Sequence, residues 1–178
     1  MKVTYYVASS LDGYIAQKGG DVSWLDNLGI SMEDVEFDSF YATVDGLIMG
    51  RNTYDFIKNQ KTWPYKDQPT WVCSSQTISA MPECNLQTQT SPEVSIQAAK
   101  KMGIKHLWVI GGGILASHLI NKSLVTHITV TQMPVLLGGD IPLFHNIEKS
   151  LALKLKSIQT YTKGFADLHY EIEANKKA

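Results

Sequence analysis

The sequence is poor in cysteine and contains no long hydrophobic run. Its two cysteines, Cys73 and Cys84, are too few for a disulfide framework and too far apart for a Cys-x-x-Cys redox pair. No apolar run approaches the roughly 18 residues that would span a bilayer. Residues 1–7 have the pattern of a strand rather than that of a secretory signal. We therefore expect a cytoplasmic protein without a membrane partner.

An excess of charge of one sign is also lacking. The 16 Lys and Arg residues nearly balance the 17 Asp and Glu residues, so the formal net charge is −1. This balance gives no reason to expect a nucleic acid partner. The five histidines have no spacing typical of metal ligands, and we predict no metal site. An apolar content of 44% and a length of 178 residues predict one globular domain over residues 1–178.

Strand-like runs alternate with helical patterns along the chain, which predicts an α/β protein. The predicted strands are residues 2–8, 46–49, 70–74, 107–110, 126–132, 151–161 and 166–173. The predicted helices are residues 32–43, 53–59, 92–102 and 114–121, the first of them capped by Ser31. The last two strands form a hairpin around residues 162–165. We therefore predict a three-layer α/β fold with a mixed, mostly parallel central sheet and an antiparallel C-terminal hairpin.

The triplet Gly111-Gly112-Gly113 ends one predicted strand and opens a predicted helix. Glycine tolerates positive φ and lets another molecule approach the bare backbone. The start of the helix adds unpaired N–H groups and partial positive charge, which suit a phosphate. A tight turn without a ligand is the alternative interpretation.

Two further turns with polar side chains follow predicted strands. Gly50-Arg51-Asn52-Thr53 offers a guanidinium and a hydroxyl, and Ser74-Ser75 offers two hydroxyls. Taken separately, each has an ordinary alternative, an exposed Arg after a turn or a Ser bound to its own backbone. Because all three turns follow strands, together they predict a dinucleotide lying across the strand ends.

The order of these elements resembles the dihydrofolate reductase fold and the related reductase domain of riboflavin biosynthesis over nearly the whole chain. Residues 7–16 contain the Ser-Leu-Asp-Gly of the riboflavin branch, residues 49–54 resemble the Met-Gly-Arg-x-Thr-Trp motif, and residues 136–144 resemble the riboflavin-type reductases. The resemblance implies NADPH as cofactor and a homodimer. It implies these cofactor-binding residues: Ala8, Gly50, Arg51, Asn52, Thr53, Ser74, Ser75, Ile110, Gly111, Gly112, Gly113 and Leu115.

The same resemblance implies three catalytic residues, Asp34, Thr131 and Trp24. Asp34 precedes Gly50 by sixteen residues, where folate reductases carry a buried acid. A carboxyl group in an apolar cleft would have a raised pKa and could assist protonation of the substrate ring. Thr131 falls where those enzymes bind the substrate's amino group, and Trp24 falls in their mobile loop. The alternative for Asp34 is a solvated, acidic helix start.

The sequence departs from the family pattern in two places. Gln68 stands where folate reductases carry the Arg that anchors the folate tail, and the predicted first helix is acidic where the riboflavin branch is basic. A neutral amide cannot form a bidentate pair with a carboxylate. We therefore predict an NADPH-dependent reductase that transfers hydride to a small pteridine- or pyrimidine-like heterocycle. The alternative is a non-catalytic nucleotide-binding module that keeps the cofactor cleft.

Overall fold

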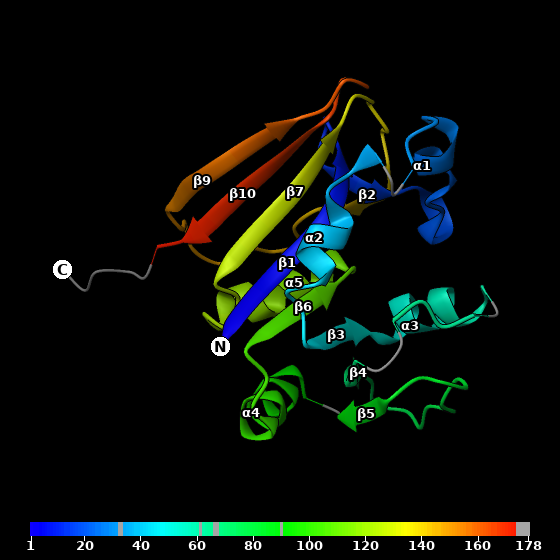
Figure 1. The fold of residues 1–178 in the computed structure, drawn as a ribbon, viewed down its shortest axis with the longest axis vertical. Helices are drawn as coiled ribbons and strands as arrows, with labels where there is room; N and C mark the ends of the chain where they lie inside the picture. The colour runs from blue at the N-terminus through cyan, green and yellow to red at the C-terminus, as the bar shows by residue number, and fades with distance from the viewer. Residues whose placement is uncertain (32–33, 61, 66–67, 90, 174–178) are drawn as a thin grey trace.

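The computed structural model describes residues 1–31, 34–60, 62–65, 68–89 and 91–173. An eight-stranded sheet runs through the protein, and its strands fan out with a marked twist (Figure 1). The strand order is β5 (Leu86–Gln89), β4 (Thr70–Cys73), β3 (Gly46–Gly50), β6 (His106–Ile110), β1 (Lys2–Ser10), β7 (His127–Met133), β10 (Ala166–Ile172) and β9 (Leu153–Thr160). Strands β5 to β7 in this order are parallel, whereas β10 is antiparallel to both β7 and β9. The predicted mixed sheet and C-terminal hairpin are therefore confirmed.

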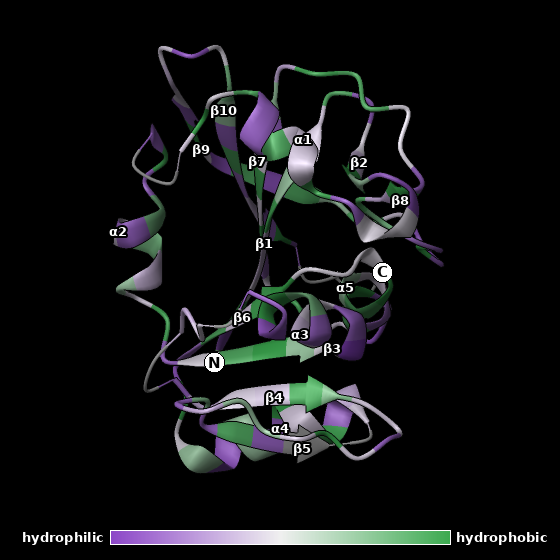
Figure 2. Ribbon diagram, turned by 90° about the vertical axis from the view of Figure 1, so that its right-hand side faces the viewer, coloured by the Kyte–Doolittle hydropathy of each residue, from purple (hydrophilic) through white to green (hydrophobic). Residues whose placement is uncertain are grey.

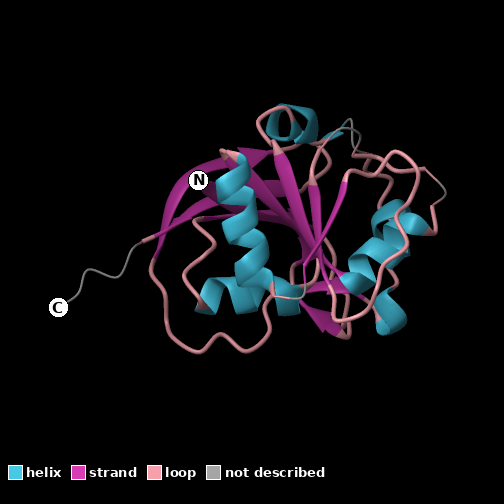
Figure 3. Ribbon diagram, turned by 90° about the horizontal axis from the view of Figure 1, so that it is seen from below, coloured by secondary structure: helices cyan, strands magenta, loops and turns pink. Residues whose placement is uncertain are grey.

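Helices cover both faces of the sheet (Figure 3). On one face, α4 (Pro92–Met102) and α5 (Gly113–Asn121) pack against buried residues that include Tyr5 and Val109. On the other face, α2 (Phe37–Tyr41) and α3 (Arg51–Lys58) pack in the cluster that contains Tyr6. Because successive strand residues point to opposite faces, a strand covered on both sides is hydrophobic along most of its length. Figure 2 shows this for β3.

The helix predicted over residues 32–43 is wrong in extent. The structure has α2 over Phe37–Tyr41, while residues 32 and 33 lie outside the described part of the chain. Asp34 Oδ2 accepts hydrogen bonds from the Ser31 N–H at 2.7 Å and from the Ser31 hydroxyl at 2.9 Å. These side-chain bonds close a local turn in place of the expected N-cap.

Several short elements have no clear sequence signal. They are β2 (Tyr14–Ala16), β8 (Ile141–Pro142), α1 (Ser23–Asn27) and a 3-10 turn over Lys18–Gly20. The edge strand β5 is polar and was likewise not predicted. Among the described residues, no helix is both long and apolar enough to cross a membrane.

An acidic side chain after β1 holds the loop that leads from β7 to β8. The Asp12 carboxylate accepts hydrogen bonds from the backbone N–H groups of Leu137 at 3.0 Å and Gly138 at 2.8 Å. Strand β2 then pairs antiparallel with β8. Two sequence motifs far apart in the chain therefore form one wall beside the strand ends.

Candidate active site

Two adjoining cavities open at the carboxyl ends of the parallel strands, the usual position of ligand sites in open α/β sheets. The larger has a volume of about 600 Å³ and the smaller about 370 Å³. Both volumes lie in the range of small-molecule sites. The two cavities share Val7, Ala8, Leu25 and Tyr65 as lining residues. Molecules bound in the two cavities would therefore meet beside Val7 and Ala8 on β1.

The larger cavity brings two of the predicted turns together. Gly50 precedes α3 and Gly112 precedes α5, and neither helix start has a side-chain cap. Gly111 and Gly112 have positive φ values of 60° and 69°, which glycine adopts without strain. The first N–H groups of both helices thus remain available to an anion. Ten predicted cofactor residues line this cavity: Ala8, Gly50, Arg51, Asn52, Thr53, Ile110, Gly111, Gly112, Gly113 and Leu115.

Gly113 also has a structural reason to lack a side chain. A Cβ atom at this position would overlap the backbone carbonyl oxygen of Pro142 in β8. The third glycine of the triplet is therefore required by close packing of α5 against the segment that contains β8, in addition to its place in the cavity lining.

Arg51 lies at the rim of the larger cavity with part of its guanidinium engaged. Its Nε donates to Asp55 Oδ2 at 2.6 Å, one turn along α3, and its Nη1 donates to the Thr77 carbonyl at 3.5 Å. The side chain is 35% exposed. The remaining N–H groups of the fork can still reach a phosphate.

The third predicted turn contributes differently. Neither Ser74 nor Ser75 is among the described residues that line the larger cavity, although Cys73 before them is. The Ser74 hydroxyl donates to the Gln76 carbonyl and accepts from the Gln76 N–H, both at 3.0 Å. These bonds match the alternative given for this turn, a Ser bound to the neighbouring backbone. Burial raises the pKa of the Cys73 thiol to about 11, so this thiol stays protonated near neutral pH.

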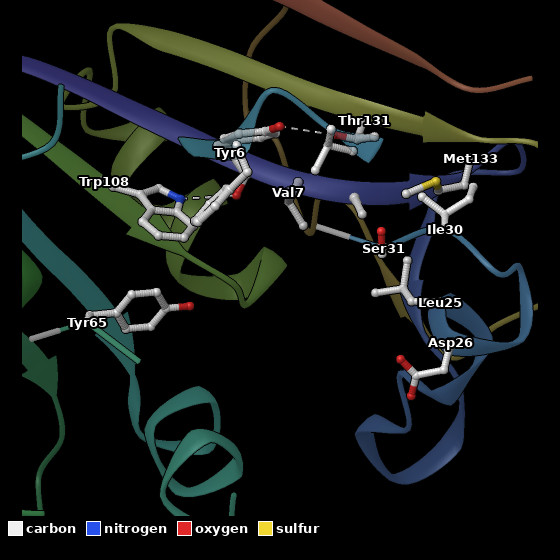
Figure 4. Close-up of a pocket in the computed structure, with 13 residues that line it drawn as sticks. Tyr6, Val7, Leu25, Asp26, Ile30, Ser31, Tyr65, Trp108, Thr131 and Met133 are labelled. Carbon is white, nitrogen blue, oxygen red and sulfur yellow. Dashed lines mark hydrogen bonds between the residues drawn. The ribbon is translucent and has the colours of Figure 1, made fainter. Parts of the chain in front are cut away.

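Aromatic side chains form one wall of the smaller cavity. Tyr6, Phe37, Tyr65 and Trp108 line it, and the Trp108 indole N–H donates to the Tyr6 carbonyl at 3.2 Å. Figure 4 shows Tyr65 and Asp26 on opposite sides of the cavity. Asp26 is the one formally charged side chain among the described lining residues. These walls suit a flat ring with polar edges.

Thr131 lies in the wall of the smaller cavity, on β7 opposite Ala8 of β1. Its Oγ1 donates to the Tyr6 hydroxyl at 3.4 Å, as drawn in Figure 4. Trp24 is buried, packs with Met133 and Phe165, and donates its indole N–H to the Ile15 carbonyl at 3.3 Å. Trp24 is absent from the described lining of both cavities.

Asp34 does not have the surroundings predicted for it. It is absent from the described lining of the smaller cavity, although its neighbours Ser31 and Val35 are present. Its Oδ2 accepts from Lys163 Nζ at 2.7 Å. Hydrogen bonds from Lys163 and Ser31 lower the pKa of Asp34 to about 2. The expected raised pKa is therefore wrong, because a cation faces this carboxylate in place of an apolar wall.

Gln68, the residue in the position of the folate-anchoring Arg, is used within the protein. Its side-chain amide donates to the Val44 carbonyl at 3.0 Å. Sequence reasoning missed Tyr6 and Asp26 as lining residues. For Tyr6, the available signal was its place two residues before Ala8 on β1, on the same face of the strand.

The sheet order, the glycine turns and the paired cavities define a protein of the dihydrofolate reductase-like class. A family model, the RibD C-terminal domain, matches residues 1–166, and the chain belongs to this family. The uncharacterized protein YwjB of Bacillus subtilis (strain 168) is 31% identical over 170 residues, which cover 95% of this chain and 97% of YwjB.

Two further relatives extend the comparison. A crystal structure of a putative riboflavin biosynthesis protein from Shewanella sp. PV-4 has a TM-score of 0.84 and 28% identity, with 98% of this chain and 100% of that chain covered. The dihydrofolate reductase of Candida albicans is 28% identical over 121 residues, which cover 68% of this chain and 58% of that enzyme.

Proposed function

We propose that the protein is an NADPH-dependent reductase that transfers hydride to a small pteridine- or pyrimidine-like heterocycle. The observation that carries the proposal is the meeting of the two cavities beside Val7 and Ala8. One cavity offers uncapped helix starts, and the other offers aromatic walls. This arrangement would bring a nicotinamide ring and a substrate ring into contact on β1.

The residues of the larger cavity fit a dinucleotide. The backbone N–H groups behind Gly50 and Gly112 would hold the two phosphates of the bridge, since both helix starts lack a side-chain cap. We propose Arg51 as the ligand of the additional 2′-phosphate of NADPH. Bound NADPH would supply the hydride, and the protein would supply orientation, exclusion of water and a proton.

The smaller cavity supports a flat heterocyclic substrate. The ring would lie among Tyr6, Phe37, Tyr65 and Trp108. Asp26 and Thr131 place oxygen acceptors on the lining, which suit the N–H groups of a pterin or an aminopyrimidine. The homodimer and the cytoplasmic location that the resemblance implies stay predictions.

A two-stage binding and turnover experiment tests the proposal. The purified protein is titrated with NADPH and, separately, with NADH while nicotinamide fluorescence is followed. We expect saturable binding with a clear preference for NADPH. Single-turnover oxidation of bound NADPH is then measured with 7,8-dihydropterin and 7,8-dihydrofolate. Oxidation with either compound supports the reductase. Binding without oxidation would favour the non-catalytic nucleotide-binding module, and binding of neither nucleotide would refute the cofactor site.

A further inference from the structure

Asp167 on β10 is a buried carboxylate for which the two cavities give no direct explanation. The residue is 2% exposed. Its Oδ2 accepts hydrogen bonds from the Tyr161 hydroxyl at 2.9 Å and the Tyr6 hydroxyl at 3.3 Å. Its Oδ1 is inaccessible and has no hydrogen-bond partner in the described part of the chain. A buried oxygen without a partner costs folding free energy, which makes this carboxylate a candidate for a role beyond packing.

A chain of hydroxyl groups connects Asp167 with the smaller cavity. Thr131 Oγ1 donates to the Tyr6 hydroxyl at 3.4 Å, and that hydroxyl donates to Asp167. Both Thr131 and Tyr6 line the cavity. Thr131 is also the cross-strand partner of Asp167 in the β7–β10 pairing. Both hydroxyl hydrogens therefore point towards the carboxylate, which leaves the Thr131 oxygen as an acceptor at the cavity wall.

The two tyrosines that bond to Asp167, Tyr6 and Tyr161, stay neutral. Burial raises the pKa of Tyr6 well above its ordinary value and the pKa of Tyr161 to about 12. The other titratable groups nearby are Glu36, whose backbone N–H donates to the Tyr161 hydroxyl, and His169 on β10, which bonds to Thr129. Asp167 is thus the one carboxyl group joined to these hydroxyl groups.

We propose that Asp167, acting through Tyr6 and Thr131, stores the proton that the reduced substrate receives. This inference rests on the proposed reductase function. In the donating state, Asp167 carries a proton that it shares with the Tyr6 oxygen. Three transfers then follow: the carboxyl O–H breaks as a Tyr6 O–H forms, the original Tyr6 proton moves to Thr131, and the Thr131 proton moves to a substrate nitrogen.

The transfers balance. The substrate gains one hydride and one proton, Tyr6 and Thr131 end as neutral hydroxyls, and Asp167 ends as a carboxylate. Of these three residues, Thr131 is the catalytic one because it would touch the substrate. Asp167 is a positioning residue because it acts through Tyr6 and Thr131. The distances of 3.3 and 3.4 Å are long for O–H···O bonds, and catalytic hydrogen bonds of this kind commonly tighten when the substrate binds.

Tyr161 provides the route by which Asp167 regains its proton. Its hydroxyl donates to the same oxygen of Asp167 that accepts from Tyr6. Unlike Asp167, Tyr161 is partly exposed, near the turn between β9 and β10. The carboxylate therefore lies between a hydroxyl that reaches the cavity and one that reaches towards solvent.

The decisive comparison is Asp167→Asn against the wild-type protein in single-turnover oxidation of NADPH by 7,8-dihydropterin. Asparagine keeps the size of the side chain but cannot supply the proton. We expect the hydride-transfer rate to fall about 100-fold, with NADPH affinity and the half-saturating dihydropterin concentration changed less than about threefold. The pH dependence of the rate should flatten. An unchanged rate with an unchanged pH profile would overturn the inference while leaving the reductase function intact.

Two further variants keep the test valid if Asp167→Asn fails to fold. Tyr6→Phe and Thr131→Val each remove one hydroxyl from the chain and should show the same pattern, a lower rate at nearly unchanged NADPH affinity. Asp45→Asn is the matched control. Its carboxylate accepts hydrogen bonds from the backbone N–H groups of Lys105 and His106 at the start of β6, at the opposite end of the sheet from the cavities. Its rate should match the wild type.

A measurement without turnover separates this inference from the reductase function. The protein is labelled with 13C at the aspartate Cγ, and the Asp167 signal is identified by its loss in Asp167→Asn. Addition of 7,8-dihydropterin without NADPH should shift this signal in the wild type and leave it unmoved in Thr131→Val. A bound dihydropterin that leaves the Asp167 signal unmoved in the wild type would overturn the inference, whatever the turnover experiment shows.

Discussion

Thr53 of α3 packs directly against Gly111, the first glycine of the triplet before α5. A Cβ atom on Gly111 would lie 3.0 Å from Thr53 Oγ1 and 3.1 Å from its Cγ2. The two turns of the proposed cofactor site are thus in contact, although Thr53 and Gly111 are 58 positions apart in the sequence. Absence of a side chain at Gly111 keeps the Thr53 hydroxyl at the surface of the larger cavity.

Gly111→Ala should therefore damage the cofactor site more than the fold. The new methyl group would displace Thr53, and the φ of 60° costs an L-residue about 1–2 kcal/mol. We expect NADPH affinity to fall at least tenfold in a fluorescence titration. Gly103→Ala is the matched control, since Gly103 has a φ of 90° and open space around its Cβ direction. It should lose similar stability and keep NADPH affinity. Equal affinity in both variants would contradict the site.

Arg51→Ala should discriminate between the two nicotinamide nucleotides. A charge-assisted hydrogen bond contributes about 1.5–3 kcal/mol, so we expect a loss of roughly 10- to 100-fold in NADPH affinity. NADH affinity should change little, because NADH lacks the 2′-phosphate. The measurement is the ratio of the two dissociation constants from parallel titrations.

Two neighbouring residues of α3 provide controls for the Arg51 experiment. Lys58→Ala removes a cation whose Nζ bonds to Ser79 Oγ at 2.9 Å and should leave the ratio unchanged. Asp55→Asn releases the Arg51 Nε and removes a negative charge, so NADPH affinity should stay the same or rise. Equal losses of NADPH and NADH in Arg51→Ala would refute the assignment of the 2′-phosphate.

The glycine turns could be predicted from sequence because their signal is local. A strand, a glycine and a helix start follow one another within a few residues at Gly50 and again at Gly111–Gly113. Asp12 shows where such reasoning ends. The motifs around Asp12 and Gly138 are each recognisable, yet only the structure shows that the Asp12 carboxylate joins them.

Asp167 and Asp34 were beyond sequence reasoning for a related reason. The surroundings of a carboxylate depend on segments distant in the chain. Asp167 meets Thr131 through the pairing of β10 with β7, and Asp34 meets Lys163 from the β9–β10 turn. Asp167 follows the half-buried Ala166 on β10, and a charged residue is rarely buried without a partner, but only the structure shows which partner it has.

His106 should make stability depend on pH between about 4 and 6.5. The residue is 5% exposed, and burial lowers its pKa from 6.5 to about 4. Thr43 Oγ1 donates to the Phe40 carbonyl, so it can only accept from His106 Nδ1–H. The neutral ring then accepts from Thr4 at Nε2. As the pH falls from 6.5 towards 4, His106 becomes protonated in the unfolded chain but stays neutral in the folded protein.

The stability associated with His106 is therefore fully present above pH 6.5 and is lost as the pH approaches 4. The lowered pKa of His106 corresponds to at most about 3.4 kcal/mol of stability. Urea unfolding of the wild type and His106→Gln at several pH values measures it, and the variant should have a smaller pH slope in this window. His145→Gln, a change at an exposed histidine, should keep the wild-type slope. The same slope in His106→Gln would refute the buried neutral ring.

Asp34→Asn tests the protonating role that the family resemblance implies. With a pKa lowered to about 2, Asp34 carries no proton to donate near neutral pH, because Lys163 and Ser31 hold it as a carboxylate. We therefore expect a much smaller loss of single-turnover rate than in Asp167→Asn.

The effect of Asp34 should instead appear as acid sensitivity. A lowered pKa contributes stability above about pH 3.8 that is lost as the pH falls towards 2. Asp34→Asn and Lys163→Met should both reduce this loss, and the double variant should resemble either single variant, because the two side chains act as a pair. A large fall in rate in Asp34→Asn, absent in Lys163→Met, would return the proton-donor role to Asp34 and show that the ion pair opens when substrate binds.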